Sequence, residues 1–209
     1  MDDTPRHLAK VLADTACELG CTPPGLAGHD VQFYRTENYL GRAVVEFLGA
    51  GIRVGQPIVV IATAEHRRTF SERLEEIGLD PDKLFSGRLA VWLDARETLA
   101  SFMEGALPNR DLFLATVGSV FERLLEKRYY LVVRAYGEMV DLLWKDGNIE
   151  GAIAVEQLWN ELAIHYRYSL LCGYSLDNFL HEAGESKLRR VCGHHSRALP
   201  LESLDQNVA

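Results

Sequence analysis

The sequence predicts a three-layer α/β fold in which a mostly parallel sheet lies between layers of helices. The first observation is a set of four short apolar runs, at residues 57–63, 89–94, 130–136 and 169–174. These runs lack strict alternation of apolar and polar residues, as is typical of parallel strands that are buried on both faces. The second observation is that helix-patterned segments separate the runs, which is the order of βαβ units.

The chain outside this region is predicted to be peripheral. Residues 5–20 have the apolar spacing of a helix, and a stretch rich in helix-breaking residues follows it. We interpret residues 1–27 as an N-terminal helical appendage and residues 28–200 as the main domain. Residues 201–209 are interpreted as a frayed C-terminal tail because they lack a structural pattern.

The main domain is predicted to begin with a strand and a helix. His29-Asp-Val-Gln-Phe-Tyr34 alternates apolar and polar residues, which indicates a short strand or an extended entry segment. Thr36 is expected to cap a helix that ends in the glycine-rich stretch 49–55.

A later helix is predicted over residues 152–166. Its core face carries Trp159, and Glu156 and Asn160 share an adjacent face because they lie four residues apart. Together with Trp144, at the end of the preceding helix, these residues are candidates to line a small-molecule pocket. The alternative is that both tryptophans are simply core residues.

Composition excludes several classes of function. The chain has 209 residues, of which 47% are hydrophobic and 25% are charged, as in ordinary globular proteins. Its net charge of −8 argues against binding to nucleic acid or to an anionic membrane surface. No signal peptide or membrane-spanning run is recognisable, so we expect a cytoplasmic protein whose four cysteines are thiols.

Catalytic motifs are not found in the sequence. The first buried run is followed by Ala62-Thr-Ala-Glu-His-Arg-Arg-Thr69, which lacks the Gly-Lys pair of a phosphate-binding P-loop. No G-x-G-x-x-G, G-x-S-x-G or H-E-x-x-H motif is present either. We therefore predict that the protein is not an enzyme and has no cofactor.

Polar and aromatic residues gather where the predicted strands end. Ligands of open parallel sheets bind beyond the carboxyl ends of the strands, so these residues are candidates for a ligand site. Arg134 interrupts an apolar strand, and Glu138, Asp94 and Glu156 are its expected partners. The alternative is an internal ion pair that joins the sheet to its helices. The predicted ligand-binding residues are Thr63, Glu65, His66, Asp94, Arg134, Tyr136, Glu138, Trp159 and Tyr174.

The sequence also contains weak candidates for metal ligands. Cys192-Gly-His194-His195 combines thiol and imidazole groups, and Cys172 on a predicted strand is able to approach them in space. The simpler interpretation is a buried cysteine beside polar histidines at a helix end. We therefore predict no metal at these four residues.

A series of short motifs follows one another along the chain. In order they are His29-Asp-Val-Gln-Phe-Tyr34, Ala64-Glu65, Asp94-Ala95-x-x-Thr98-Leu99, Phe102-Met103, Arg134-Ala-Tyr-Gly-Glu138-Met-Val, Leu143-Trp144-x-x-Gly147-Asn148, Leu158-Trp159-Asn160-Glu161-Leu162, Leu171-Cys172-Gly173-Tyr174 and Val191-Cys192-x-x-His195-Ser196. This series resembles the MEDS domain, the methanogen/methylotroph, DcmR-type sensory domain. The resemblance extends over roughly residues 28–200, and each motif is weak alone, whereas their number and order are fairly specific.

This resemblance implies a sensory input module for small hydrocarbon-derived molecules. Such domains are joined to DNA-binding, histidine-kinase or anti-sigma-type outputs, whereas we expect no output domain within these 209 residues. The family also looks like a distant relative of RecA/KaiC-type ATPases, one that has lost the phosphate-binding P-loop. The resemblance therefore implies a fold of that type without nucleotide hydrolysis.

The leading hypothesis is a sensory or signal-relay domain that binds a small organic molecule and acts on a partner kinase, anti-sigma factor or transcription factor. In it, Arg134 and Glu138 orient the ligand, and Tyr136, Trp159 and Tyr174 make apolar contacts. A second hypothesis is a nucleotide-binding protein without hydrolysis, in which His66 and the two arginines after it meet the phosphate. A third is an interaction module that binds a regulatory protein or a second copy of itself.

Overall fold

The structure, a computed structural model, describes residues 27–87, 89–126, 131–180 and 184–199. The predicted helix over 5–20 and the tail over 201–209 lie outside these residues. The main sheet has six strands in the order β3-β2-β6-β7-β1-β8, and all of its pairs are parallel. The strands are β1 (Gly28–Tyr34), β2 (Ile58–Ala62), β3 (Ala90–Asp94), β6 (Val133–Gly137), β7 (Tyr168–Ser175) and β8 (Arg197–Ala198).

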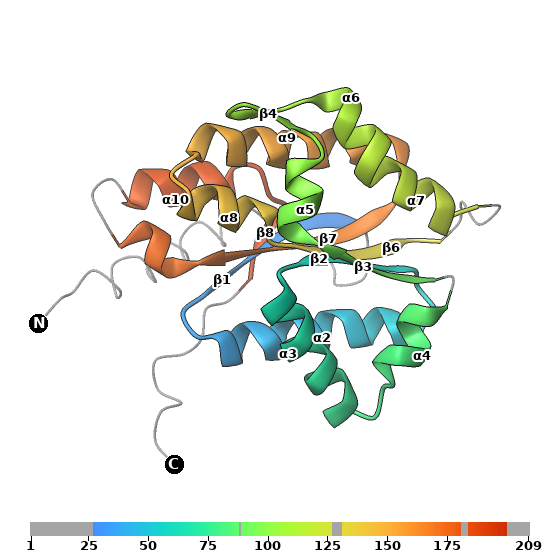
Figure 1. Ribbon diagram of the computed structural model, residues 1–209. Coiled ribbons are helices and arrows are strands. Elements are labelled where there is room, and N and C mark those ends of the chain that lie inside the picture. Colours follow the sequence, from blue (N-terminus) through green and yellow to red (C-terminus); the bar gives the residue numbers. More distant parts are fainter. Residues whose placement is uncertain (1–26, 88, 127–130, 181–183, 200–209) are drawn as a thin grey trace, which may run out of the picture.

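Helices cover both faces of this sheet, which confirms the predicted three-layer α/β fold (Figure 1). One layer consists of α2 (Glu37–Arg53), α3 (Ala64–Glu76) and α4 (Pro81–Ser86). The other contains α5 (Ala95–Ala100), α6 (Arg110–Phe113), the π-helix η1 (Leu114–Gly118), α7 (Ser119–Leu124), α8 (Met139–Lys145), α9 (Ile149–His165) and α10 (Gly184–Cys192). Between these elements the chain also forms the hairpin β4 (Met103–Glu104) and β5 (Leu107–Pro108) and the 3₁₀-helix η2 (Leu176–Phe179).

Local sequence explains where the long helices begin. The hydroxyl of Thr36 accepts a hydrogen bond from the amide of Tyr39, which confirms the predicted cap of α2. Asn148 caps α9 in the same way through the amide of Gly151, so this helix starts three residues earlier than the sequence pattern predicts. The segment at residues 29–34 forms a buried strand between β7 and β8 rather than a mere entry segment.

The alternation of side chains along the strands creates two separate cores. His29, Val31 and Phe33 of β1 face the layer of α9 and α10, whereas Tyr34 packs with α2 and α3. In β6, Tyr136 belongs to the core under α2 and α3. Neighbouring residues of a strand thus point to opposite faces of the sheet. The position of a residue in this alternation therefore decides which of the two cores its side chain enters.

Candidate functional site

The structure brings buried polar residues together in two places, one on each side of the sheet. We call Glu37, Thr63, His66, Tyr136 and Glu138 the edge cluster, because it lies where β2 and β6 end, next to α2 and α3. The second group lies between β1, β7 and α9 and is completed by a residue that follows α10. This core cluster consists of His29, Glu156, Cys172 and His195.

Glu138 is the centre of the edge cluster. It directly follows β6, and only 3% of its side chain is exposed. One carboxylate oxygen accepts a hydrogen bond from the amide of Thr63 at 2.6 Å, and the other accepts one from the hydroxyl of Tyr136 at 2.9 Å. His66 Nδ1 also contacts this second oxygen. These contacts satisfy a buried carboxylate, which would otherwise be costly.

His66 connects this buried carboxylate to solvent. Its Nε2 atom lies 2.6 Å from a carboxylate oxygen of Glu37, the first residue of α2, whose side chain is 63% exposed. Burial of His66 favours its neutral form, but hydrogen bonds and attraction from Glu138 and Glu37 outweigh this effect and raise its pKa to about 10. The imidazolium therefore joins α3 to α2 at neutral pH.

The position of Glu138 bears on nucleotide binding. Helix α3 begins directly after β2, and in P-loop proteins the backbone amides at such a junction hold phosphate. Here the amide of Thr63 donates to Glu138 Oε1. The amide of Thr63 is therefore bound to an internal carboxylate, whose charge would repel a phosphate placed beside it.

A further buried carboxylate, Asp141, lies close to this edge. Its oxygens accept hydrogen bonds from the amide of Ser175 at 2.9 Å and the side chain of Asn178 at 2.7 Å. Lys145 Nζ lies 2.8 Å away, and the hydroxyl of Tyr34 donates to Asp141 at 3.4 Å. The carboxyl edge of the sheet is therefore rich in carboxylates held in defined positions.

Two of the predicted ligand residues lie on the rim of this edge and do not join the cluster. Glu65 is exposed on the first turn of α3. Asp94 caps α5 by accepting hydrogen bonds from the amides of Arg96 and Glu97, and it forms an ion pair with Arg67 at 2.9 Å. Asp94 therefore has a local structural role, whereas Glu65 lies at the solvent-exposed surface.

The expected partners of Arg134 are wrong. This arginine is the second residue of β6, so it lies at the amino end of the strand, far along the strand from Glu138. Its guanidinium donates to Gln56 Oε1 at 2.8 Å and to the carbonyl of Phe47 at 2.9 Å, and it stacks over the Phe47 ring. An amide and a carbonyl, instead of a carboxylate, satisfy the buried charge.

Trp159 and Tyr174 lie on the opposite side of the sheet from the edge cluster. Trp159 is 1% exposed and packs against Phe113 and Phe121, which agrees with the alternative of a core residue. Tyr174 is fully buried, and its hydroxyl donates to Glu156 Oε1 at 2.8 Å. The nine predicted residues therefore do not form one site, and four of them meet in the edge cluster.

The core cluster joins residues that are distant in the sequence. His29 Nε2 lies 3.2 Å from Cys172 Sγ and 3.1 Å from Glu156 Oε2, and His195 Nε2 lies 3.4 Å from Glu156 Oε1. All four residues are buried. Burial raises the pKa of Glu156, but the charges of His195 and His29 outweigh it and lower the pKa well below the ordinary value. Burial and the charge of Glu156 raise the pKa of the Cys172 thiol.

This cluster changes the set of weak metal candidates. Cys172 and His195 belong to it as the sequence suggested, whereas His29 and Glu156 take the places expected for Cys192 and His194. The sequence does not predict His29 as a ligand. Its spacing from Val31 and Phe33 shows only that it lies on the same face of the strand as these two core residues. In the sequence, Glu156 is a candidate partner for Arg134 and a candidate pocket residue, but not a candidate metal ligand.

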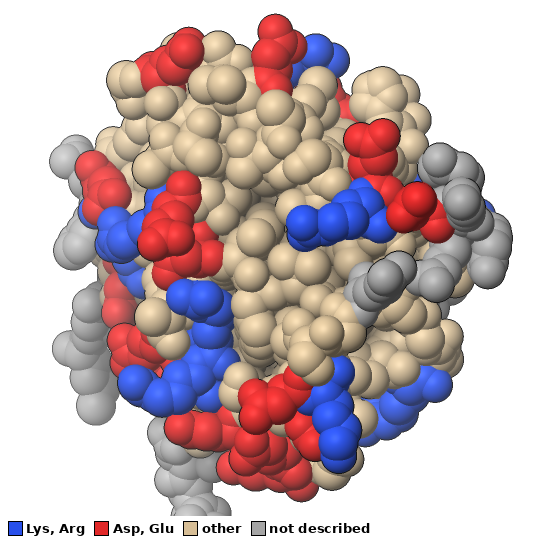
Figure 2. Space-filling view, turned by 45° about the vertical axis from the view of Figure 1, so that its right-hand side comes forward, with Lys and Arg blue, Asp and Glu red and all other residues tan. Residues whose placement is uncertain are grey.

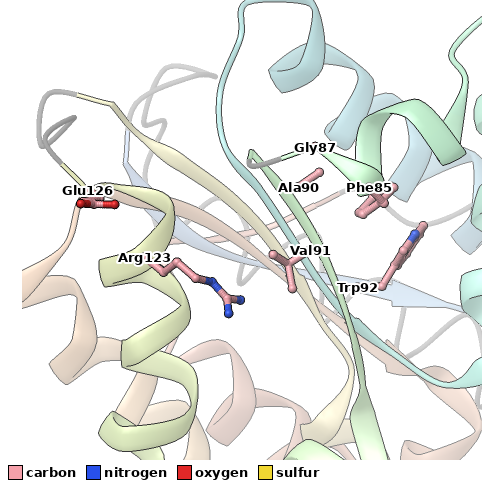
Figure 3. A pocket seen from close by; sticks show the side chains of 7 residues that line it. All are labelled: Phe85, Gly87, Ala90, Val91, Trp92, Arg123 and Glu126. Carbon is pink, nitrogen blue, oxygen red and sulfur yellow. The ribbon is translucent and has the colours of Figure 1, made fainter.

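A surface pocket lies elsewhere, beside the edge strand β3 (Figure 3). It has a volume of about 540 Å³, and the stacked rings of Phe85 and Trp92 form one wall. Arg123 of α7 points towards Val91 from the other side (Figure 3). The pocket belongs to the amino end of β3, so it does not adjoin the edge cluster. Its lining residues are Phe85, Gly87, Ala90, Val91, Trp92, Arg123 and Glu126.

Alkaline pH is expected to weaken the fold through His66. Its pKa rises from an ordinary value of 6.5 to about 10 in the folded protein, so protonation favours folding. This stabilisation is complete below pH 6.5 and is lost as the pH rises towards 10. We expect a loss of about 2 kcal/mol, well below the full linkage value because Glu37 is solvent-exposed and screened.

Urea unfolding at a series of pH values checks this prediction. His66→Asn is the control, because the pH dependence assigned to His66 should vanish in this variant while that of the other groups remains. Parallel pH profiles for the wild type and the variant would contradict the prediction.

The surface and the helices agree with the composition. On the face shown in Figure 2, acidic and basic side chains alternate around a central uncharged area, and the described residues there form no continuous basic stripe. Within the described ranges, none of the helices combines the length and the apolar character needed to cross a bilayer.

Comparison with known proteins identifies the family. Searches among curated proteins and among solved structures found no match. The family model described as MEDS, the MEthanogen/methylotroph, DcmR Sensory domain, matches residues 28–196. This range contains β1, β2, β3, β6 and β7 together with both clusters. The chain therefore belongs to the MEDS family, which is a family of sensory domains.

Proposed function

We propose that this chain senses a small organic molecule at the carboxyl edge of the sheet and relays the signal to a partner regulator. The observation that carries the proposal is the edge cluster, in which the buried carboxylate of Glu138 reaches solvent through His66 and Glu37. This arrangement lies where parallel sheets bind ligands, in a chain without a catalytic motif.

The chemistry of the edge indicates the class of ligand. Glu138, Glu37 and Asp141 supply hydrogen-bond acceptors and negative charge. A ligand for this place therefore carries a hydroxyl or amine group that donates hydrogen bonds, on a small organic body. A phosphate-bearing ligand is disfavoured because Glu138 already fills the start of α3.

The contact between Glu37 and His66 offers a means of relay. Glu37 is the first residue of α2, and His66 lies in the first turn of α3. A ligand whose hydroxyl or amine group donates to the carboxylate of Glu37 would compete with His66 for it and release the start of α2 from α3. The contact between Glu37 and His66 would then be either formed or broken. The ligand would favour the broken state, and a partner protein would bind the two states differently.

Thermal shift and calorimetry with a panel of small alcohols, amines, short-chain acids and nucleotides test this function. We expect a hydroxyl- or amine-bearing compound to bind the wild type, and Glu138→Gln to weaken this binding at least about tenfold. The matched control is Glu65→Gln, which removes a nearby exposed carboxylate outside the cluster and should bind normally.

Two outcomes would overturn the proposal. The first is that no organic compound of the panel binds the wild type, or that Glu138→Gln binds as well as the wild type does. The second is tight binding of ATP or GTP that is lost with substitutions at the start of α3, which would support the nucleotide-binding alternative instead.

A further inference from the structure

We propose that His29, Glu156, Cys172 and His195 form a closed site for one divalent transition-metal ion, with zinc as the expected occupant. One ligand atom from each of the four buried residues lies within 4.8 Å of all the others. Imidazole, thiolate and carboxylate groups are the ligands that zinc uses in proteins. This site is separate from the edge cluster and goes beyond the proposed function.

The shortest distances among the four groups are close to those of tetrahedral coordination. Zinc bonds of about 2.0–2.3 Å place neighbouring ligand atoms of a tetrahedron about 3.3–3.6 Å apart. His29 Nε2 is 3.1 Å from Glu156 Oε2 and 3.2 Å from Cys172 Sγ. Glu156 Oε2 is 3.6 Å from Cys172 Sγ, and His195 Nε2 is 3.4 Å from Glu156 Oε1. The groups therefore need only small shifts to surround one ion.

Both histidines are held in the orientation that metal ligands adopt. His195 Nδ1 donates to the carbonyl of Val191 at 2.8 Å, and His29 Nδ1 donates to Asn160 Oδ1 at 3.0 Å. Asn160 is fixed in turn, because its amide donates to the carbonyl of His194 at 3.0 Å. Each Nε2 atom is therefore left to face the centre of the cluster, as outer hydrogen bonds arrange for zinc-bound histidines.

His195 supplies an independent observation that points to a ligand. Its side chain is fully buried, and its Nε2 atom faces the cluster at 3.4 Å from Glu156 Oε1 without making a hydrogen bond of good geometry. A buried polar atom without a partner is costly and requires an explanation. A metal ion bonded to this nitrogen provides one.

Charge balance also favours an ion at this place. Both imidazole rings contact Glu156, and the ring centroids of His29 and His195 are 4.2 Å apart. A divalent cation with one thiolate, one carboxylate and two neutral imidazoles forms a site without net charge.

The ligand set indicates a structural role for the ion. Four protein ligands fill a tetrahedral shell and leave no open position, as in structural zinc sites. The ion would join β1, β7 and α9 to the turn after α10, segments that are far apart in the sequence. We therefore expect metal binding to raise the melting temperature of the full chain.

Metal analysis and cobalt substitution test the proposal. We expect elemental analysis of the purified protein to find a single zinc ion per chain. After removal of zinc, Co²⁺ should produce the visible absorption bands of a tetrahedral site together with a thiolate-to-cobalt charge-transfer band. Zinc should displace the cobalt and abolish both signals.

The chain offers matched control variants. Cys172→Ser should abolish the charge-transfer band and weaken zinc binding more than about 100-fold, whereas Cys192→Ser, at a second buried cysteine of the described residues, should change neither. His195→Gln should weaken binding similarly, while His194→Gln should not. Asn160→Ala should weaken zinc binding by about 10–100-fold, because Asn160 positions His29 without itself being a ligand.

The site would be disproved by a wild-type protein that takes up neither Zn²⁺ nor Co²⁺ after reduction of its thiols. Equal zinc binding by Cys172→Ser, His195→Gln and the wild type would also disprove it. Circular dichroism shows whether each variant is folded. If Cys172→Ser is unfolded, the cobalt spectrum of the wild type alone decides whether the site exists. None of these readouts depends on Glu138, so the two proposals fail separately.

Discussion

Replacing Glu138 by alanine is expected to lower the free energy of unfolding by about 3–5 kcal/mol. The substitution removes one buried carboxylate that accepts from Thr63 and Tyr136 and balances the charge of His66. The hydroxyl of Tyr136 is fully buried, so this donor is left without its acceptor in the interior. His66 would lose its buried partner and keep only the exposed Glu37.

Urea unfolding at neutral pH measures this effect. Glu138→Gln is the informative second variant, because its amide oxygen still accepts from the Thr63 amide while the charge that holds His66 is gone. It should destabilise the fold by about half as much. Glu65→Ala, at an exposed position on α3, should change the stability by less than about 0.5 kcal/mol. A loss below about 1 kcal/mol for Glu138→Ala would contradict the assigned network.

The edge cluster shows what sequence patterns predict well. Parallel strands that are buried on both faces read as apolar runs, and the residue that follows such a run lies at the carboxyl edge. Glu138 and His66 were placed there by this reasoning alone, and the structure brings them into contact. Glu37 was missed, because nothing in the sequence states that the first turn of α2 lies against α3.

Arg134 and Tyr174 show where the same reasoning fails. The pattern located the strands that carry these residues. To predict at which end of the strand and on which face of the sheet a residue lies, its exact position within the strand must also be known. Arg134 lies at the amino end of β6, and Tyr174 points to the side of α9. Strand alternation would have separated Tyr174 from Tyr136 only if the pairing of β6 with β7 had been known.

The core cluster depends on information that no local pattern contains. His29 of β1 pairs with Leu170 of β7, and Val31 pairs with Cys172, so the register of these strands sets His29 beside the thiol. The order of the strands in the sheet decides that β1 and β7 are neighbours. A cysteine next to two histidines in the sequence drew attention to residues 192–195, whereas three-dimensional proximity selects only His195 of them.

Trp159 is expected to be the most sensitive aromatic residue of the larger core. Trp159→Ala should lower the free energy of unfolding by about 3–5 kcal/mol, because it removes a large side chain that is 1% exposed and leaves a cavity. The rings of Phe113, Phe121 and Tyr168 pack around this side chain, at centroid distances of 5.5, 6.2 and 6.0 Å. These neighbours belong to three different elements. We therefore expect that they do not move together into the space left by the indole ring.

Trp92→Ala is the matched control for this prediction. Trp92 is only partly buried at the edge strand, where its main aromatic contact is a stack with Phe85, so its loss should cost about 1–2 kcal/mol. Chemical unfolding of both variants beside the wild type measures the difference. A tryptophan that served mainly to contact a ligand would instead leave stability nearly unchanged and alter binding. Equal costs for the two variants would therefore contradict the assignment of Trp159 to the core.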